Sequence, residues 1–177
     1  MTGSVIRPAA PADCAAIARI YNHYVRETVV TFEEDEVPAA DIEARLGEVS
    51  RASLPWLVVE EAGSITGYAY ATRWKGRSAY RYSAESTIYL APSSTGRGVG
   101  TRLYGALLDD LRSRSLHVVI GGIALPNQAS VALHERLGFS KVAHYKEVGF
   151  KFSRWIDVGY WQTLLSSPTS HRAITAS

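Results

Sequence analysis

Residues 84–104 read AESTIYLAPSSTGRGVGTRLY, and this stretch carries the strongest local signal in the sequence. Residues 84–90 predict a strand, which Pro92 ends. The glycines at 96, 98 and 100 predict a turn, and the apolar residues from Tyr104 to Leu111 recur at helical spacing behind it. Glycines at a helix N-terminus let a phosphate approach backbone N–H groups, and the helix dipole favours its negative charge.

The same turn has a plainer interpretation, a flexible connection before a tight helix start. A dinucleotide fingerprint would need a third glycine at position 101, which is Thr. The Gly-Lys-Ser/Thr triplet of a P-loop does not occur in the sequence. Both interpretations of the turn therefore stay open on these residues alone.

A second cluster of polar residues lies in residues 125–139, LPNQASVALHERLGF. Asn127, Ser130 and His134 are spaced three and four apart, so on a helix they share one face. A polar face headed by an Asn at a strand end can bind an amide-containing cofactor arm. Taken alone, however, His134 is better explained as a partly buried structural histidine.

The rest of the chain alternates predicted strands and helices, with no internal repeat and no linker. We therefore expect one α/β domain over residues 1–165 and a loose polar tail over 166–177. The expected strands are 5–7, 56–60, 65–72, 118–124, 140–147 and 155–164, and the expected helices begin near Pro11, cover 42–49 and cover 127–137, where Gly138 caps the last.

Composition excludes several classes of protein. Of the 177 residues 46% are hydrophobic and 20% charged, and a net charge of +2 is too weak to indicate nucleic acid or an anionic membrane as partner. No apolar run approaches the about 20 residues of a membrane-spanning helix, and the first eight residues lack the apolar core of a signal peptide. The single cysteine, Cys14, excludes a disulfide framework and a multi-thiolate metal site. We expect a soluble cytoplasmic protein without a metal.

Taken together, the strand, glycine turn and helix of 84–111 and the strand and Asn-headed helix of 118–139 resemble the GNAT acetyltransferase superfamily. Further stretches are similar to the phosphinothricin N-acetyltransferases and occur in that family's order from about residue 6 to 165. They are NHY (22–24), PWLV (55–58), WKGR (74–77), AESTIY (84–89), LPN (125–127), LHE (133–135) and WIDVGYWQ (155–162).

The resemblance implies the acyl-CoA N-acyltransferase fold, a mixed and mostly antiparallel central sheet with a splayed strand pair, flanked by helices. It also implies acetyl-CoA as donor and a small amino-acid-like amine as acceptor. One departure is Thr95, where the superfamily usually has Arg or Gln; the backbone donors survive that change. The implied cofactor contacts are the strand end Ile88, Tyr89 and Leu90 and the polar pair Asn127 and Ser130 for pantetheine, and Gly96, Arg97, Gly98, Val99, Gly100 and Thr101 for pyrophosphate.

The family match implies that Glu85 is the general base. An amine is protonated at pH 7 and must lose a proton before it attacks, and partial burial would raise the pKa of a carboxyl toward the working range. An ion-paired structural Glu is the alternative. His134 stands where many superfamily members carry a tyrosine near the cofactor sulfur, so it could protonate the leaving thiolate, orient the thioester or be structural.

The basic and aromatic segment 73–82 is a further candidate site. Such interleaving can indicate single-stranded nucleic acid or a solvated loop. The resemblance favours a third interpretation, in which Lys75, Arg77 and Tyr80 bind the anionic end of the acceptor. Phe32 and Tyr89 are expected to line the same pocket.

We therefore expect acetyl transfer from acetyl-CoA to the amine of phosphinothricin or a related compound such as methionine sulfoximine. Direct attack in a ternary complex fits, since Cys14 lies far from the motifs along the chain. The family implies a homodimer. Two alternatives stay open: an acetyltransferase of the same fold for another amine, such as a polyamine, a peptide or a protein N-terminus, and a non-catalytic CoA-binding regulatory module.

Overall fold

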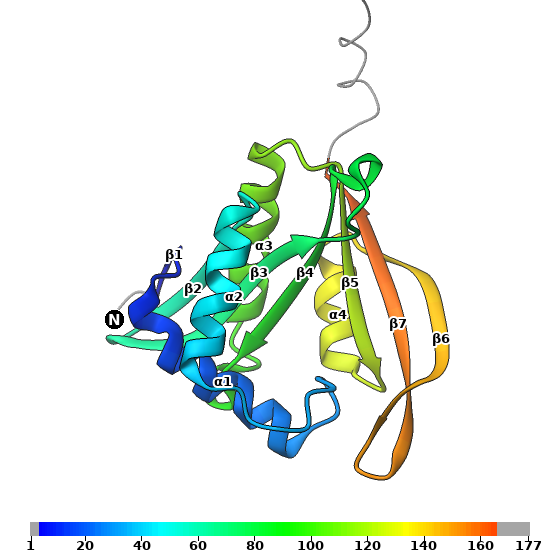
Figure 1. Cartoon of the computed structure of the whole chain (residues 1–177), viewed down its shortest axis with the longest axis horizontal. Coiled ribbons are helices and arrows are strands. Elements are labelled where there is room, and N and C mark those ends of the chain that lie inside the picture. Colours follow the sequence, from blue (N-terminus) through cyan, green and yellow to red (C-terminus); the bar gives the residue numbers. More distant parts are fainter. Residues whose placement is uncertain (1–3, 166–177) are drawn as a thin grey trace, which may run out of the picture.

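Over residues 4–165, the part of the chain that the computed structural model describes, a seven-stranded sheet runs in the order β1-β2-β3-β4-β5-β7-β6 (Figure 1). All neighbouring strands pair antiparallel except β4 and β5, which are parallel. The mixed and mostly antiparallel central sheet expected from the sequence is confirmed. The strands are β1 (Val5–Pro8), β2 (Trp56–Glu61), β3 (Ser64–Arg73), β4 (Ser83–Leu90), β5 (Val118–Leu125), β6 (Ser140–Lys151) and β7 (Arg154–Leu164).

Helices cover both faces of the sheet, with α1 and α2 in front and α3 and α4 behind in Figure 1. The alternation of β2 shows why both faces are needed. Val58 packs into the core beneath α1 and α2, whereas Leu57 and Val59 pack into the core beneath α3. The helices are α1 (Cys14–Glu27), α2 (Ala39–Arg51), α3 (Val99–Ser113) and α4 (Gln128–Arg136), with short 3₁₀ helices η1 (Pro11–Asp13), η2 (Ser78–Tyr80) and η3 (Pro92–Ser94).

The parallel pair β4 and β5 separates soon after it begins. Only three residue pairs are in register, from Ser83 opposite Val118 to Glu85 opposite Ile120. Beyond Glu85 the two strands diverge into a V in Figure 1, and the segment after α1 crosses the open end of the V. The splay leaves ladder groups of residues 86–89 without a neighbouring strand on that side, so they are available to a ligand, whereas the Leu90 carbonyl oxygen accepts a hydrogen bond from the Tyr24 hydroxyl at 2.6 Å.

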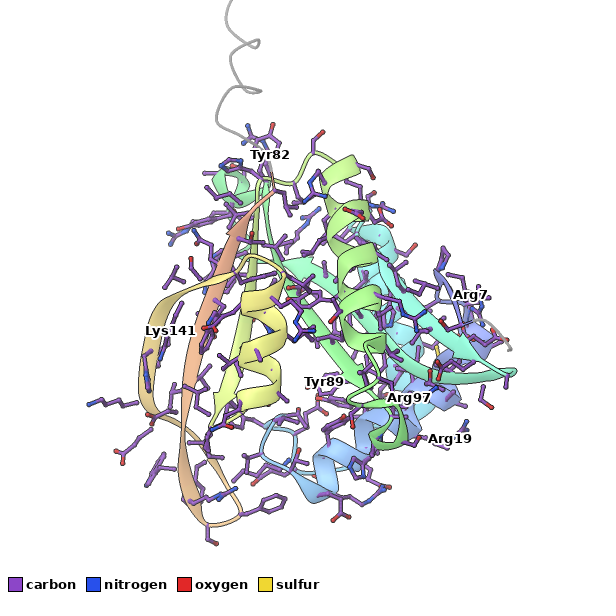
Figure 2. The ribbon with its side chains drawn as sticks, turned by 180° about the vertical axis from the view of Figure 1, so that it is seen from behind. Arg7, Arg19, Tyr82, Tyr89, Arg97 and Lys141 are labelled. Atoms are coloured by element: carbon purple, nitrogen blue, oxygen red, sulfur yellow. The ribbon has the colours of Figure 1, made fainter. Side chains whose placement is uncertain are left out.

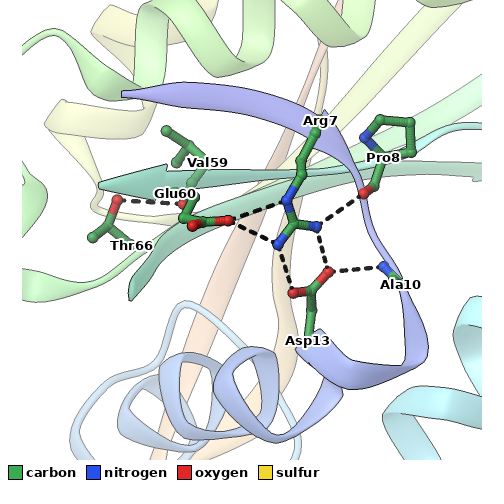
Figure 3. A network of polar contacts seen from close by, with 7 residues as sticks. All are labelled: Arg7, Pro8, Ala10, Asp13, Val59, Glu60 and Thr66. Atoms are coloured by element: carbon green, nitrogen blue, oxygen red, sulfur yellow. Dashed lines mark hydrogen bonds and ion pairs between the residues drawn. The ribbon is translucent and has the colours of Figure 1, made fainter. Parts of the chain in front are cut away.

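An arginine ties the first elements together (Figure 3). The Arg7 guanidinium on β1 donates to both carboxylate oxygens of Asp13 in η1, at 2.8 and 2.9 Å, and to Glu60 on β2. This hydrogen bond holds the pKa of Asp13 below its usual value. The bidentate contact fixes the start of α1 against the sheet edge.

The structure differs from the sequence expectation mainly at β6. The sequence predicts a strand that ends at residue 147, but pairing with β7 continues to Lys151 across a shift in register between Tyr145 and Gly149. Glu147 has a φ of +50° at that irregularity. The expected tail, 166–177, lies outside the described residues. Gly138 follows α4 with a φ of +86°, which confirms the expected left-handed cap.

Candidate active site

A cavity of about 660 Å³ fills the opening between β4 and β5. Residues 86–90 of β4 form one wall, and residues 122–124 of β5 form the other. The volume lies within the range of pockets that hold small molecules and cofactors. Among the sequence-predicted residues, it brings together Ile88, Tyr89, Leu90, Gly96, Gly98, Gly100, Thr101, Asn127, Ser130 and His134.

The glycine turn closes one end of this cavity at the N-terminus of α3. Gly96 and Gly98 have φ values of +72° and +76°, which other L-residues rarely adopt, and the space around both is open. Gly100 is tighter, since a Cβ there would lie 3.3 Å from the Leu90 side chain. Arg97 does not line the cavity; it reaches Glu61 at 3.4 Å beside the loop (Figure 2). The turn therefore offers backbone N–H groups and a helix dipole to an anion.

Asn127 stands at the other wall of the cavity as the N-cap of α4. Its Oδ1 accepts a hydrogen bond from the Ser130 backbone N–H at 3.1 Å. Because that oxygen is committed to the helix, the Nδ2 amide is the part of the side chain that can donate to a ligand. Amide recognition by this side chain is therefore compatible with its capping role.

Glu85 lies at the apex of the V, on the last paired position of β4. Gly122 on β5 lines the cavity and lies between the cavity and Glu85. A Cβ on Gly122 would lie 3.5 Å from Glu85 Oε1 and 3.2 Å from the Tyr160 ring. Burial raises the pKa of Glu85, while the charge of Lys75 acts in the opposite direction and lowers it. A half-buried carboxylate with a raised pKa next to a cavity can accept a proton.

His134 belongs to a buried chain of hydrogen bonds. Its Nδ1 lies 2.8 Å from the Ser130 carbonyl oxygen, which only accepts, so Nδ1 carries the proton and donates. Nε2, 3.0 Å from the Tyr104 hydroxyl, is then the acceptor. The Tyr104 oxygen in turn receives the Ser86 hydroxyl at 2.6 Å. Burial lowers the pKa of His134, which favours this neutral imidazole.

The segment 73–82 divides between two places. Lys75 is close enough to affect the Glu85 charge, and its ammonium lies 4.8 Å from the Trp74 ring centroid. Arg77 and Tyr80, together with Lys75, line a second cavity of about 490 Å³ that also includes Arg73, Arg81 and Arg114. The structure thus brings Lys75 toward Glu85 but does not place Arg77 or Tyr80 in the cavity between β4 and β5.

Phe32 and Tyr89 do not line the same cavity. Tyr89 lines the main cavity and lies between α3 and α4 in the rear view of Figure 2. Phe32, 40% exposed, packs on Gly149 of β6 instead, and its neighbour Val30 lines the cavity.

Sequence reasoning missed three residues of this site. Gly122 and Tyr160 flank Glu85, and Tyr104 bonds His134. The signal for Tyr104 was present, because a tyrosine on a buried helix stripe needs a partner for its hydroxyl. Nothing in the linear pattern points to Gly122 or Tyr160, which only the β5–β7 register sets side by side.

Two searches of residues 4–165 concern other classes of protein. None of the helices in this range is long and apolar enough to cross a membrane. In the same range, no three His, Cys, Asp or Glu side chains are grouped so that they could hold a metal ion.

Comparisons with known proteins agree with this geometry. Residues 6–159 match a family described as "Acetyltransferase (GNAT) domain". The chain is 40% identical over 169 residues to the L-amino acid N-acyltransferase MnaT of Escherichia coli, covering 96% of this chain and 98% of that protein. It is also 40% identical over 163 residues to the L-methionine sulfoximine/L-methionine sulfone acetyltransferase of Salmonella typhimurium, covering 90% and 94%. The phosphinothricin acetyltransferase of Sinorhizobium meliloti, solved in complex with acetyl-CoA, superimposes with a TM-score of 0.89 at 33% identity and covers 97% of this chain and 95% of that chain.

Proposed function

Because the chain belongs to the GNAT acetyltransferase family, we propose that it acetylates the α-amine of phosphinothricin or of a related amino acid such as methionine sulfoximine. It is an acetyl-CoA-dependent N-acetyltransferase. The observation that supports a small acceptor is the cavity between the splayed strands β4 and β5. The glycine turn, Asn127 and Gly122 line this cavity, and the Glu85 carboxylate lies next to Gly122.

The residues of the cavity fit acetyl-CoA. The backbone N–H groups of 96–101 would hold the pyrophosphate, and open space around Gly96 and Gly98 allows its approach. The unpaired edge of 88–90 would bind the pantetheine amides, with Asn127 and Ser130 on the opposite wall. When bound, acetyl-CoA supplies the thioester carbonyl that a free amine attacks.

Glu85 would act as the general base. It removes a proton from the acceptor ammonium, directly or through water, so that the nitrogen lone pair can form the C–N bond as the C–S bond breaks. Its raised pKa brings a carboxylate closer to the working range. Direct attack fits, because Cys14 is buried in the core beneath α1 and α2 and offers no acyl-enzyme nucleophile.

His134 would orient the site rather than donate a proton to the leaving thiolate. Both ring nitrogens are engaged, Nδ1 as donor to Ser130 and Nε2 as acceptor from Tyr104. The ring also needs Gly121, since a Cβ there would lie 2.5 Å from Nε2. The chain from Ser86 to His134 therefore links β4, α3 and α4 around the splay.

Lys75 would attract the anionic end of the acceptor. It is the cation whose charge Glu85 senses, so a ligand between them would hold its amine near the carboxylate and its anion near the ammonium. Arg77 and Tyr80 would contribute from the second cavity, which they line together with Lys75. Arg77 would add positive electrostatic potential, and the Tyr80 ring would form part of the cavity wall.

We further propose that the enzyme is a homodimer that works in the cytoplasm, where its acetylation of phosphinothricin would confer resistance. The edge strand β6 and its partner β7 expose large apolar side chains, a pattern typical of interaction surfaces. They are Val142, Tyr145, Val148, Phe150, Trp155 and Leu164. Light scattering at assay concentration would give twice the chain mass; the mass of one chain would contradict the dimer.

An amine panel tests the proposed function. The protein is incubated with acetyl-CoA and phosphinothricin, methionine sulfoximine, a polyamine or an alanyl peptide, and thiol release is followed with mass spectrometry of the product. We expect phosphinothricin and methionine sulfoximine to give the highest kcat/KM. Preference for the polyamine or the peptide would support the alternative amine, and no thiol release with any amine would support a CoA-binding module.

A further inference from the structure

A lysine is buried at the end of β6, away from the catalytic carboxylate. Lys151 is 1% exposed, and its ammonium donates a hydrogen bond to the Thr31 carbonyl oxygen at 2.9 Å. The ring of Phe152 lies under the same ammonium at 5.1 Å. Removing an ammonium from water costs several kcal/mol, and an apolar side chain of similar volume is often as stabilising or more so. Core stability therefore does not explain a lysine at this position.

The partner of Lys151 is a junction between three elements. Thr31 lies in the segment 28–38 between α1 and α2, and its hydroxyl is 2.7 Å from the hydroxyl of Tyr21 on α1. The Tyr21 ring in turn packs edge-on against the Tyr89 ring of β4, with the ring centroids 5.2 Å apart. Because Tyr89 and Val30 both line the cavity, the position of Thr31 sets the shape of the cavity wall.

A second contact joins the same segment to β6. The Phe32 ring packs so closely on Gly149 that a Cβ on residue 149 would collide with it. Strand alternation places Gly149 and Lys151 on this inner side, whereas Val148 and Phe150 are exposed on the outer side. Two successive inward positions of β6 therefore contact Thr31 and Phe32, neighbours in the segment across the mouth of the V.

From these contacts we infer that Lys151 and Gly149 are positioning residues for acceptor recognition, holding segment 28–38 against the cavity so that Val30 and Tyr89 form its acceptor wall. The inference rests on the proposed function for the nature of the acceptor. The segment approaches the wall through the Tyr89 side chain, whereas acetyl-CoA would be held by the backbone of 88–90, the glycine turn and Asn127, which make none of these contacts. Burial lowers the pKa of Lys151, while the charges of Glu34 and Glu33 in the same segment act in the opposite direction.

Lys151→Met tests this role, because it keeps the length of the side chain and removes the hydrogen bond and the charge. The variant should fold with a Tm at or above that of the wild type. Its KM for the acceptor should rise at least about fivefold, as expected if the competent position of the segment is populated about a fifth of the time. Its KM for acetyl-CoA should stay within about twofold. Lys141→Met removes an exposed lysine from the same strand and is the matched control.

Gly149→Ala is the second variant, because it displaces Phe32 without touching the buried charge. It should show the same split between the two KM values. Light scattering of each variant ensures that a change of oligomeric state is not mistaken for a change of the cavity wall.

Hydrogen exchange over residues 28–38 reads the position of the segment without any substrate. We expect faster exchange there in Lys151→Met and unchanged exchange at the glycine turn. If the wild-type protein acetylates none of the amines, the proposed function fails while this measurement still tests the inference. Unchanged exchange and an unchanged acceptor KM in the folded variants would overturn it, as would an equal rise in both KM values.

Discussion

The hydroxyl of Tyr104 on α3 lies 3.0 Å from Nε2 of His134 on α4. The direction of this bond is set from the far side of the ring, because Nδ1 must donate to the Ser130 carbonyl oxygen. In the neutral ring Nε2 is therefore the acceptor, and burial lowers the pKa of His134, which favours this neutral form. Protonation would require Nε2 to become a second donor, facing a hydroxyl that already directs its own proton at it.

This arrangement predicts a pH dependence of stability. Burial lowers the pKa of His134 from its ordinary value of 6.5, so the unfolded chain binds a proton that the folded protein excludes. The contribution of neutral His134 to the free energy of unfolding is fully present above pH 6.5. It is lost as the pH falls from there through the pKa of His134 in the folded protein. Urea unfolding of the wild type should show stability falling in this range. A His134→Gln variant should lack that component of the slope; an identical slope would assign it to other groups.

The cofactor end of the site is tested by Gly98→Asp. A side chain and a negative charge at this position would occupy the space that a pyrophosphate needs, so affinity for acetyl-CoA should fall by at least about 100-fold. Gly63→Asp is a matched control, since Gly63 has a φ of +77°, equally open surroundings and a place in the β2–β3 turn. Calorimetry that finds equal affinity for acetyl-CoA in the two folded variants would remove the phosphate role from the turn.

The acceptor end is tested by Lys75→Met. Losing a charge-assisted contact typically costs about 1.5–3 kcal/mol, so the KM for phosphinothricin should rise about tenfold or more. Lys75 also lowers the pKa of Glu85, so its removal should move the acid limb of the kcat/KM profile to higher pH. Arg77→Ala should raise the KM less and leave the limb in place. If Arg77→Ala has the larger effect on KM, the acceptor lies in the second cavity instead.

Local patterns in the sequence were sufficient for most elements of this fold. The apolar stripe from Tyr104 to Leu111 and the glycines before it predicted both the helix α3 and the turn at its N-terminus. The same reasoning predicted a strand end at residue 147, whereas β6 continues to Lys151. Gly149 packs under the Phe32 ring and Lys151 donates to the Thr31 carbonyl oxygen, and a local pattern cannot contain partners more than 100 residues away in sequence.

The candidate site divides in the same way. Glu85 and Asn127 follow from motifs, because each sits at a fixed place on its own element. Lys75, Arg77 and Tyr80 line the second cavity together, and only Lys75 affects the charge of Glu85. Composition does not fix which residue of the segment 73–82 comes near that carboxylate. Ser86 lies 18 residues before Tyr104, and Tyr104 lies 30 residues before His134. Only the packing of α3 on β4 and α4 therefore reveals this chain of hydrogen bonds.

Replacement of Glu85 by Gln tests the central claim most directly, because it keeps the size and hydrogen bonding of the side chain and removes the proton acceptor. A positioned general base contributes about 10²–10⁴-fold, so kcat at pH 7 should fall by that factor while affinity for acetyl-CoA is retained. The deficit should shrink as the pH rises, because free amine then becomes abundant. Glu48→Gln, on the surface of α2, should behave as wild type. A Glu85→Gln enzyme with near-normal kcat at pH 7 would contradict the account and assign proton removal to another group.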